Sequence, residues 1–346
     1  MVLPDDEFEF FFDKPWSDGL PVVIPTEERI EDMLTGVDRN PNGVIGEVPP
    51  ANEVMTVHAV AVHAVMAGCR AEYFSGLVAA LEAVLEPPFN INGIQATMHS
   101  CAPLTIFNGS YGKEIGLHGG SGCFGPGFRA NATIGRAIRL ILMNLGGGIP
   151  GVTSMSTFSQ PSRYTYCIRE NEEDSPWEPL SVTRGYRTEE DTVTAVACEN
   201  PKLIFDDISK DPETLLAGPA DAVAYLGCMN ALRRTDLVFA ISPDHAKICA
   251  DAGWSKADVH AYLCEKAGKT LGELKVGGGY TEDRIQDLPI KVDLENDNFF
   301  VPTIKDQDDL MIIVAGGIPG PISAFMHGWN GASRPVTRKI YLQDEA

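Results

Sequence analysis

The chain has 346 residues, of which 44% are hydrophobic, and it carries a formal net charge of −21 at pH 7. This length suits one large or two ordinary domains with a substantial core. The strong negative charge excludes nucleic acid and anionic membrane surfaces as partners, because both repel an acidic chain.

The few cysteines and the lack of long apolar runs indicate in which cellular compartment we expect the protein. The sequence holds no run of about 18 apolar residues, so it predicts no membrane span. Its first residues, MVLPDDEFEFFF, do not have the basic start of a signal peptide. The eight cysteines are too sparse for a disulfide scaffold and form no CxxC pair. We therefore expect a cytoplasmic protein with reduced thiols.

Apolar strands that run into helices are typical of an α/β protein. We expect two or three small βα lobes packed around a shared site. The sequence predicts an extended N-terminal arm (1–52) with a short helix capped by Thr26, a first α/β lobe (53–150), a crossover loop region (151–192) and a second α/β lobe (193–346).

The first lobe begins with helices and ends with one. Helical patterns cover 56–67 and 71–86, and short strands are predicted over 93–100 and 104–110. The glycine-rich stretch HGGSGCFGPGFR follows at 118–129. A helix over 131–147 comes next, and we expect Asn131 or Thr133 to cap it.

The second lobe alternates strands and helices. In chain order it is predicted to hold a strand over 193–198, a helix over 212–234, a strand over 236–242, helices over 244–253 and 255–267 (capped by Ser255), a strand over 310–317, the loop IPGP (318–321) and a helix over 322–329.

Three strand ends are alike: TIFNGS, VFAISPDH and IIVAGGIPGP each run an apolar strand into small or polar residues. Ligands of open α/β sheets bind at the carboxyl ends of strands. If these ends meet, one site is lined by Asn108, Ser110, Asp244, His245, Gly316, Gly317 and Gly320. The alternative is a set of ordinary tight turns on separate surfaces.

Three cysteines are candidate metal ligands. Cys69 and Cys123 each follow a glycine at a break between elements, and Cys228 repeats this Gly-Cys pattern. Thiolates from three separate segments suit zinc or an iron–sulfur cluster with one open iron. Two alternatives remain open, a single reactive thiol at Cys123 and buried, inert cysteines.

Other residue types suit anion binding and proton transfer. Arg129 and Asn131 stand at a helix start, where backbone N–H groups favour an anion. The GxGxxG pattern that starts at Gly120 has no strand before it, so it is weak evidence for a dinucleotide. His245 is the candidate general acid or base, with Asp244 beside it. The alternative for this pair is a capping aspartate and a solvent-facing histidine.

The stretch ENEEDSPW (170–177) is interpreted as a solvated acidic loop that Trp177 anchors by packing. Its alternative role is to bind a cation or a basic partner.

Several stretches together resemble an uncharacterised bacterial family that is loosely related to the UGSC-motif (seleno)proteins. They are DGLPVVIPTEERIEDML, AVMAGCRAEY, RANATIGRAIRLIL, ENEEDSPWEPL and SPDHAKICADAGWSKADVHAYL. The resemblance covers most of the chain, and GSGC at 120–123 is its nearest match to the UGSC tetrapeptide. It implies no assigned reaction and no catalytic residues.

We expect an enzyme that acts on a small anionic metabolite, as a lyase, a hydro-lyase or a hydrolase, and that forms a homo-oligomer. The alternatives are a thiol-based oxidoreductase that uses Cys123 and a non-catalytic small-ligand binder or complex subunit. The assigned roles are catalysis for His245, Cys123 and Asp244, substrate binding for Arg129, Asn131, Asn108, Gly317 and Gly320, and binding of zinc or an iron–sulfur cluster for Cys69, Cys123 and Cys228.

Overall fold

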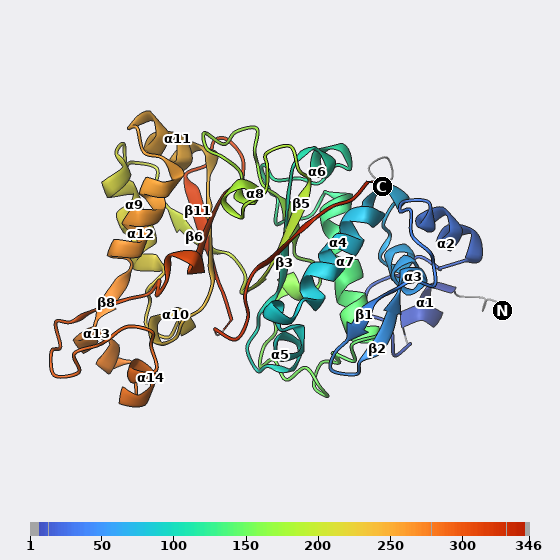
Figure 1. Cartoon of the computed structure of the whole chain (residues 1–346), viewed down its shortest axis with the longest axis horizontal. Helices are drawn as coiled ribbons and strands as arrows, with labels where there is room; N and C mark the ends of the chain where they lie inside the picture. The colour runs from blue at the N-terminus through green and yellow to red at the C-terminus, as the bar shows by residue number, and fades with distance from the viewer. Residues whose placement is uncertain (1–6, 13, 278, 330, 343–346) are drawn as a thin grey trace.

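The computed structural model describes residues 7–12, 14–277, 279–329 and 331–342, and these form four layers (Figure 1). Two four-stranded sheets pack face to face, and helices cover the outer face of each sheet. The predicted α/β class is confirmed.

The first sheet has the strand order β4–β3–β5–β12. Its strands are β3 (Ala102–Asn108), β4 (Cys167–Arg169), β5 (Thr192–Cys198) and β12 (Val336–Lys339). β3 runs parallel to β4 and antiparallel to β5, with Asn108 opposite Thr192. β5 in turn pairs antiparallel with β12.

The second sheet has the order β10–β7–β11–β6 and repeats this pattern. Its strands are β6 (Lys202–Phe205), β7 (Leu237–Ile241), β10 (Leu310–Val314) and β11 (Ile322–His327). β7 runs parallel to β10 and antiparallel to β11, which pairs antiparallel with β6. The two sheets therefore share one topology.

The two halves of the chain exchange their outer strands. β6 follows β5 in sequence but forms the edge of the second sheet, and β12 follows β11 but forms the edge of the first. Residues 193–198, which the sequence-based division assigns to the second lobe, lie in β5 of the first sheet. Neither sheet is complete without the other half.

Side chains between the sheets alternate with side chains under the helices. Ile106 and Ile313 belong to the core between the sheets, whereas Phe107 and Ile312 belong to the outer cores. Strands buried on both faces are apolar throughout, as LVFAI and LMIIV show. The predicted helix over 322–329 is wrong, because Ile322–His327 form a strand. A short run that is mostly apolar, such as ISAFMH, shows neither the alternation of a half-buried strand nor the periodicity of a helix, so its sequence fits both.

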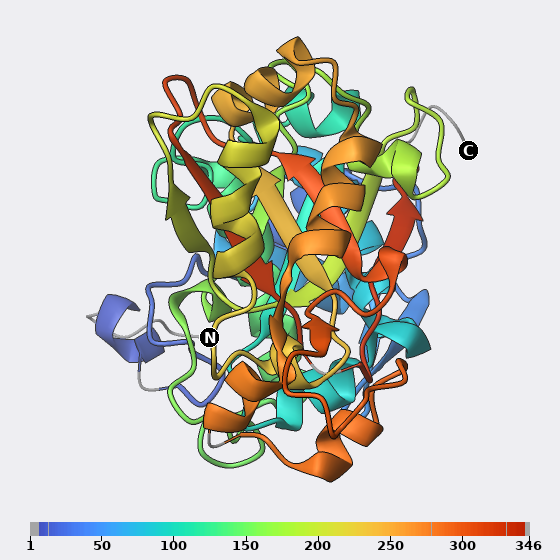
Figure 2. The same ribbon diagram turned by 90° about the vertical axis from the view of Figure 1, so that its left-hand side faces the viewer.

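Each outer layer consists mainly of three helices. α3 (Val57–Ala67), α4 (Phe74–Leu85) and α7 (Arg129–Asn144) supply the core over the first sheet. α9 (Pro212–Ala222), α11 (Pro243–Asp251) and α12 (Lys256–Lys266) supply the core over the second, and Figure 2 shows these helices in front of it.

Some helix boundaries agree with the sequence and others do not. Ser255 caps α12 in a capping box, and Thr26 caps α2, as predicted. α7 instead begins at Arg129, with Phe128 at its N-cap. The strand predicted over 93–100 is wrong, because its first residues belong to α5 (Ile91–Ala96), which the Asn90 side chain caps by accepting from Gly93 N.

The remaining elements are short. They are α1 (Glu7–Phe12), α2 (Glu27–Leu34), the hairpin of β1 (Val44–Val48) and β2 (Glu53–Thr56), α6 (Ser110–Glu114), α8 (Leu180–Thr183), α10 (Met229–Leu232), β8 (Gly268–Thr270), α13 (Leu271–Val276), α14 (Glu282–Gln286) and β9 (Phe300–Pro302). Across the described part of the chain, no helix combines the length and apolarity needed to cross a membrane.

A buried carboxylate joins the two sheets. Glu170 follows β4, is fully buried, and accepts hydrogen bonds from Asn108 Nδ2 (2.7 Å) and Val314 N (3.2 Å). It also accepts from Leu180 N at 2.7 Å, and the Lys256 ammonium of α12 lies 3.8 Å away. Its contacts therefore reach both sheets and the outer helices of the second half.

This placement corrects the interpretation of residues 170–177 as a solvated loop at its first two residues, whereas Glu173 and Asp174 are exposed as expected. Glu170 and Asn171 are both buried, and Asn171 N donates to Val314 O at 2.8 Å. Trp177 anchors the other end, as expected, because its indole Nε1 donates to Trp254 O at 3.1 Å and its ring packs on the second core.

Glu170→Gln should lower the free energy of unfolding by about 3–5 kcal/mol, because it leaves the buried Lys256 ammonium without a carboxylate. Asp251→Asn is the matched control. It breaks the exposed Lys247–Asp251 pair and should cost less than about 1 kcal/mol. Urea unfolding measures both losses, and equal losses would contradict the role given to Glu170.

Candidate functional site

The glycine-rich stretch is a loop between α6 and α7 whose turns need glycine. Gly122 and Gly127 have φ angles of +77° and +117°, which side chains rarely permit. Cys123 N donates to Gly120 O at 3.1 Å, and Gly125 N donates to Gly122 O at 2.7 Å. Two tight turns therefore follow one another and surround Cys123.

This loop lies against the loop that follows β10 in the other half. Gly316 N donates to Gly119 O at 2.9 Å. A side chain on Gly119 would collide with Arg169 O, and one on Gly317 would collide with Ser121. Two glycine-containing loops, one from each half, thus meet without intervening side chains.

Asn131 fixes the loop to α7. Its Oδ1 accepts from His118 N at 2.8 Å, and its Nδ2 donates to His118 O (2.9 Å) and Cys123 O (3.3 Å). The side chain is buried. Both ends of the amide that was expected to bind a substrate anion are therefore engaged with the loop, and the residue positions Cys123.

Cys123 is one of the residues that line a cleft of about 590 Å³. Its side chain is buried in the core between the sheets. Burial raises the pKa of the thiol to about 11, although nearby backbone amides, among them those of Gly316 and Phe124, act in the opposite direction. The thiol is neutral at pH 7, because the backbone amides offset only part of the cost of burying a thiolate.

Residues of both halves line this cleft. Phe124 and Leu203 are exposed at its edge, and the Phe124 ring lies 5.7 Å from that of the buried Tyr166. Tyr166 donates its hydroxyl to Glu199 O at 2.8 Å. Further lining residues are Pro126, Pro161, Ser162, Thr165, Asn200 and Pro201. Such a mixture of apolar walls and a few polar groups suits a small, partly apolar ligand.

The three candidate metal-binding cysteines lie in three different hydrophobic clusters. Burial raises the pKa of Cys69 to about 12, and the Cys228 thiol donates to Val223 O at 3.5 Å. Within the described residues, no group of three His, Cys, Asp or Glu side chains could hold a metal ion. The structure therefore does not bring Cys69, Cys123 and Cys228 together as a ligand set.

Asp244 and His245 line a different cleft, of about 460 Å³. His245 Nε2 lies 2.8 Å from Asp206 O and must carry the proton, so Nδ1 accepts from Ser323 Oγ at 2.7 Å. Asp244 accepts from Gly320 N at 2.6 Å. Both ring nitrogens are occupied, and the structure does not place this pair with Cys123.

The other predicted site residues also have protein partners. Arg129 is exposed and donates its Nε to Gly68 O at the end of α3. Asn108 donates to Glu170 and Glu172, and Ser110 is exposed at the start of α6. Of the three similar strand ends, the one at Gly316 and Gly317 meets the Cys123 loop.

Two arginines near the Cys123 cleft were not predicted as site residues from the sequence. Arg139 and Arg163 line a small inner pocket that shares Ser162 and Tyr166 with the Cys123 cleft. Arg139 stands between Ile138 and Leu140 in the apolar stretch RAIRLIL, where a charge is costly unless it is used. A charged residue within an apolar helix pattern could therefore have marked Arg139 as functional. Arg163 lies in the crossover region, whose sequence has no periodic pattern that would mark it in the same way.

Comparison of the chain with protein-family models, curated proteins and solved structures found no match to any of them. The function is therefore argued from the geometry of the site.

Asn131→Ala should raise the hydrogen-exchange rates of the amides over 118–125 by about tenfold or more, because His118 N–H loses its acceptor. Asn144→Ala, which removes a single bond to Trp16 O at the other end of α7, is the control and should leave the loop unchanged. Exchange measured by mass spectrometry distinguishes them. Unchanged exchange rates over 118–125 in Asn131→Ala would show that Asn131 does not hold the loop in place.

Proposed function

We propose that this protein is a thiol-dependent hydrolase that cleaves a small ester or amide bound in the Cys123 cleft. The observation that carries the proposal is the position of the Cys123 sulfur. Cys123 lines a cleft to which both halves contribute, and backbone amides near its sulfur offset part of the cost of burying a thiolate. The expected anionic substrate stays a prediction.

Cys167 lines the same cleft, but its environment favours Cys123 as the nucleophile. The Cys167 thiol has its pKa raised to about 12 by burial, and its hydrogen bond is with the Thr105 side chain. Backbone amides near Cys123 keep the rise of its pKa smaller, at about 11, so the nucleophilic thiolate forms more readily at Cys123 than at Cys167.

The reaction uses the thiol as nucleophile and needs no oxidant. The S–H proton passes to a water molecule, and the thiolate then forms the sulfur–carbon bond while the carbonyl electron pair moves to the substrate oxygen. The bond to the leaving group then breaks, and the leaving group takes that proton. Water attacks the thioester, the carboxylic acid departs, and a proton returns to the sulfur of Cys123. The backbone amides stabilise sulfur as it loses and regains its proton.

Hydrolysis of p-nitrophenyl acetate and butyrate tests this function. The wild-type protein should turn over these esters with saturation, and intact-mass measurement should find an acyl group on Cys123. Cys123→Ser should lose about 100-fold or more in turnover, as expected when a nucleophile is removed. Cys264→Ser is the control, because Cys264 is half-exposed and its pKa is also raised to about 11 by burial. Full activity in Cys123→Ser, or acyl groups confined to Cys264, would refute the proposal.

The rate should also depend steeply on pH. Because burial raises the pKa of Cys123 to about 11, only about one molecule in ten thousand carries the thiolate at pH 7. The rate of acyl transfer to Cys123 should therefore rise about tenfold for each pH unit between 7 and 10. A plateau below pH 9, measured by stopped-flow release of p-nitrophenolate, would show that the thiol is already ionised and that this description of its surroundings is wrong.

A further inference from the structure

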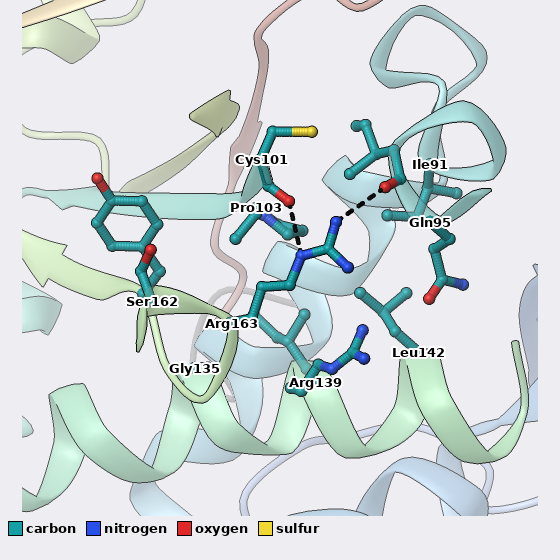
Figure 3. A pocket seen from close by; sticks show the side chains of 13 residues that line it. Ile91, Gln95, Cys101, Pro103, Gly135, Arg139, Leu142, Ser162 and Arg163 are labelled. Carbon is teal, nitrogen blue, oxygen red and sulfur yellow. Dashed lines mark hydrogen bonds between the residues drawn. The ribbon is translucent and has the colours of Figure 1, made fainter. Parts of the chain in front are cut away.

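Arg139 and Arg163 place two positive groups in one pocket. Arg139 projects from α7, and Arg163 projects from the loop that precedes β4. Figure 3 shows both guanidinium groups in the pocket close to Leu142 and Gln95. In a chain whose formal net charge is −21, two neighbouring cations would ordinarily be neutralised by carboxylates.

Within the described residues, neither arginine forms an ion pair with a carboxylate. Asp18 lines the outer cleft beside them, but both of its oxygens accept from Arg136, at 2.8 Å each. Burial and the charge of Arg163 lower the pKa of Arg139 to about 10. The two guanidinium groups are therefore desolvated and repel each other, and the Asp18 carboxylate, which raises the pKa of Arg139 in part, is itself paired with Arg136.

The two arginines differ in how firmly the protein holds them. Arg163 donates its Nε to Cys101 O at 3.0 Å and its Nη1 to Ser154 Oγ at 2.7 Å, so its position is fixed. Arg139 donates to Gly148 O at 3.1 Å, and no other acceptor for it is found in the described residues. Most of the five N–H donors of this guanidinium are free to bind a ligand.

Space for a ligand lies on both sides of the arginines. The inner pocket measures about 20 Å³, enough for roughly one water molecule. A cleft of about 680 Å³ outside it is lined by the same two arginines and by apolar groups that include Met143, Ile149 and Phe158. At the inner pocket, Gln95 is only 3% exposed and its Oε1 has no hydrogen-bond partner.

We propose that Arg139 and Arg163 bind the carboxylate of a small organic acid on the side of the outer cleft, which its apolar body occupies, and that the inner pocket holds a water molecule. The planar fork of a guanidinium matches the two oxygens of a carboxylate. Gln95 Oε1 would accept a hydrogen bond from a water that enters with the ligand. A single negative charge suits the site, because the Asp18 carboxylate nearby disfavours a more highly charged group. The proposal makes no use of Cys123 and stands apart from the proposed hydrolysis.

Calorimetric titration of the full chain with hexanoate and 3-phenylpropionate tests this site. Hexanamide and 3-phenylpropionamide are the uncharged controls, and inorganic phosphate tests the alternative anion. Both carboxylates should bind saturably, and neither amide should bind. Arg139→Gln should weaken carboxylate binding about 10- to 100-fold, as the loss of a charged hydrogen-bonding partner predicts. Arg233→Gln, an exposed arginine of the second half, should leave binding unchanged.

The stability of ligand-free Arg139→Gln separates a binding role from a structural one. An unpaired, desolvated charge destabilises the folded protein, so its removal should leave the Tm equal to or above that of the wild type. A marked fall in Tm would instead show that Arg139 serves the fold. If that variant does not fold, Arg139→Lys keeps the positive charge but lacks the planar guanidinium group, and it should bind hexanoate more weakly than the wild type does.

Other outcomes would overturn the proposal. Equal binding of carboxylates and amides would show that the cleft recognises only the apolar body. Binding of phosphate without carboxylates would refute the assigned ligand class. Cys123→Ser should bind hexanoate as the wild type does, so a failure of the proposed hydrolysis would leave this result unaffected.

Discussion

Glu170 is a carboxylate buried between two sheets, and its hydrogen bonds to Asn108 and Val314 hold the ends of β3 and β10 together. A carboxylate without partners could not stay there, because the loss of its hydration would be too costly. Backbone N–H groups, an amide and the Lys256 ammonium replace that hydration. The two halves are thus joined by directional bonds as well as by apolar packing, and directional bonds fix which strand ends meet.

The Cys123 cleft follows from that alignment. With β4 and β10 ending side by side, the loop after β10 brings Gly316 to Gly119 and to the Cys123 sulfur. A contact this close between two backbones needs glycine on both loops, and a side chain on Gly317 would collide with Ser121. The glycines therefore serve the joint between the halves, and the cradle of amides around the sulfur is a consequence of it.

The sequence predicted those features that depend on local chemistry. The caps at Thr26 and Ser255 and the glycine loop around Cys123 are properties of short segments, and the structure contains them. Features that depend on distant partners were not predictable. Ile322–His327 is a strand whose faces are covered from Ser323 onward, and β12 joins the first sheet because β5 leaves an edge for it. No pattern within either segment contains this information.

Helix α7 connects the two sites on which the proposals rest. Asn131 near its start clamps the Cys123 loop, and Arg139 farther along faces the inner pocket. Ser162 and Tyr166 line both the inner pocket and the Cys123 cleft. A displacement of α7 along its axis would disturb the thiol and the arginines together. The packing of α7 on the first sheet opposes such a displacement, and so the fold sets the geometry of both sites through one rigid element.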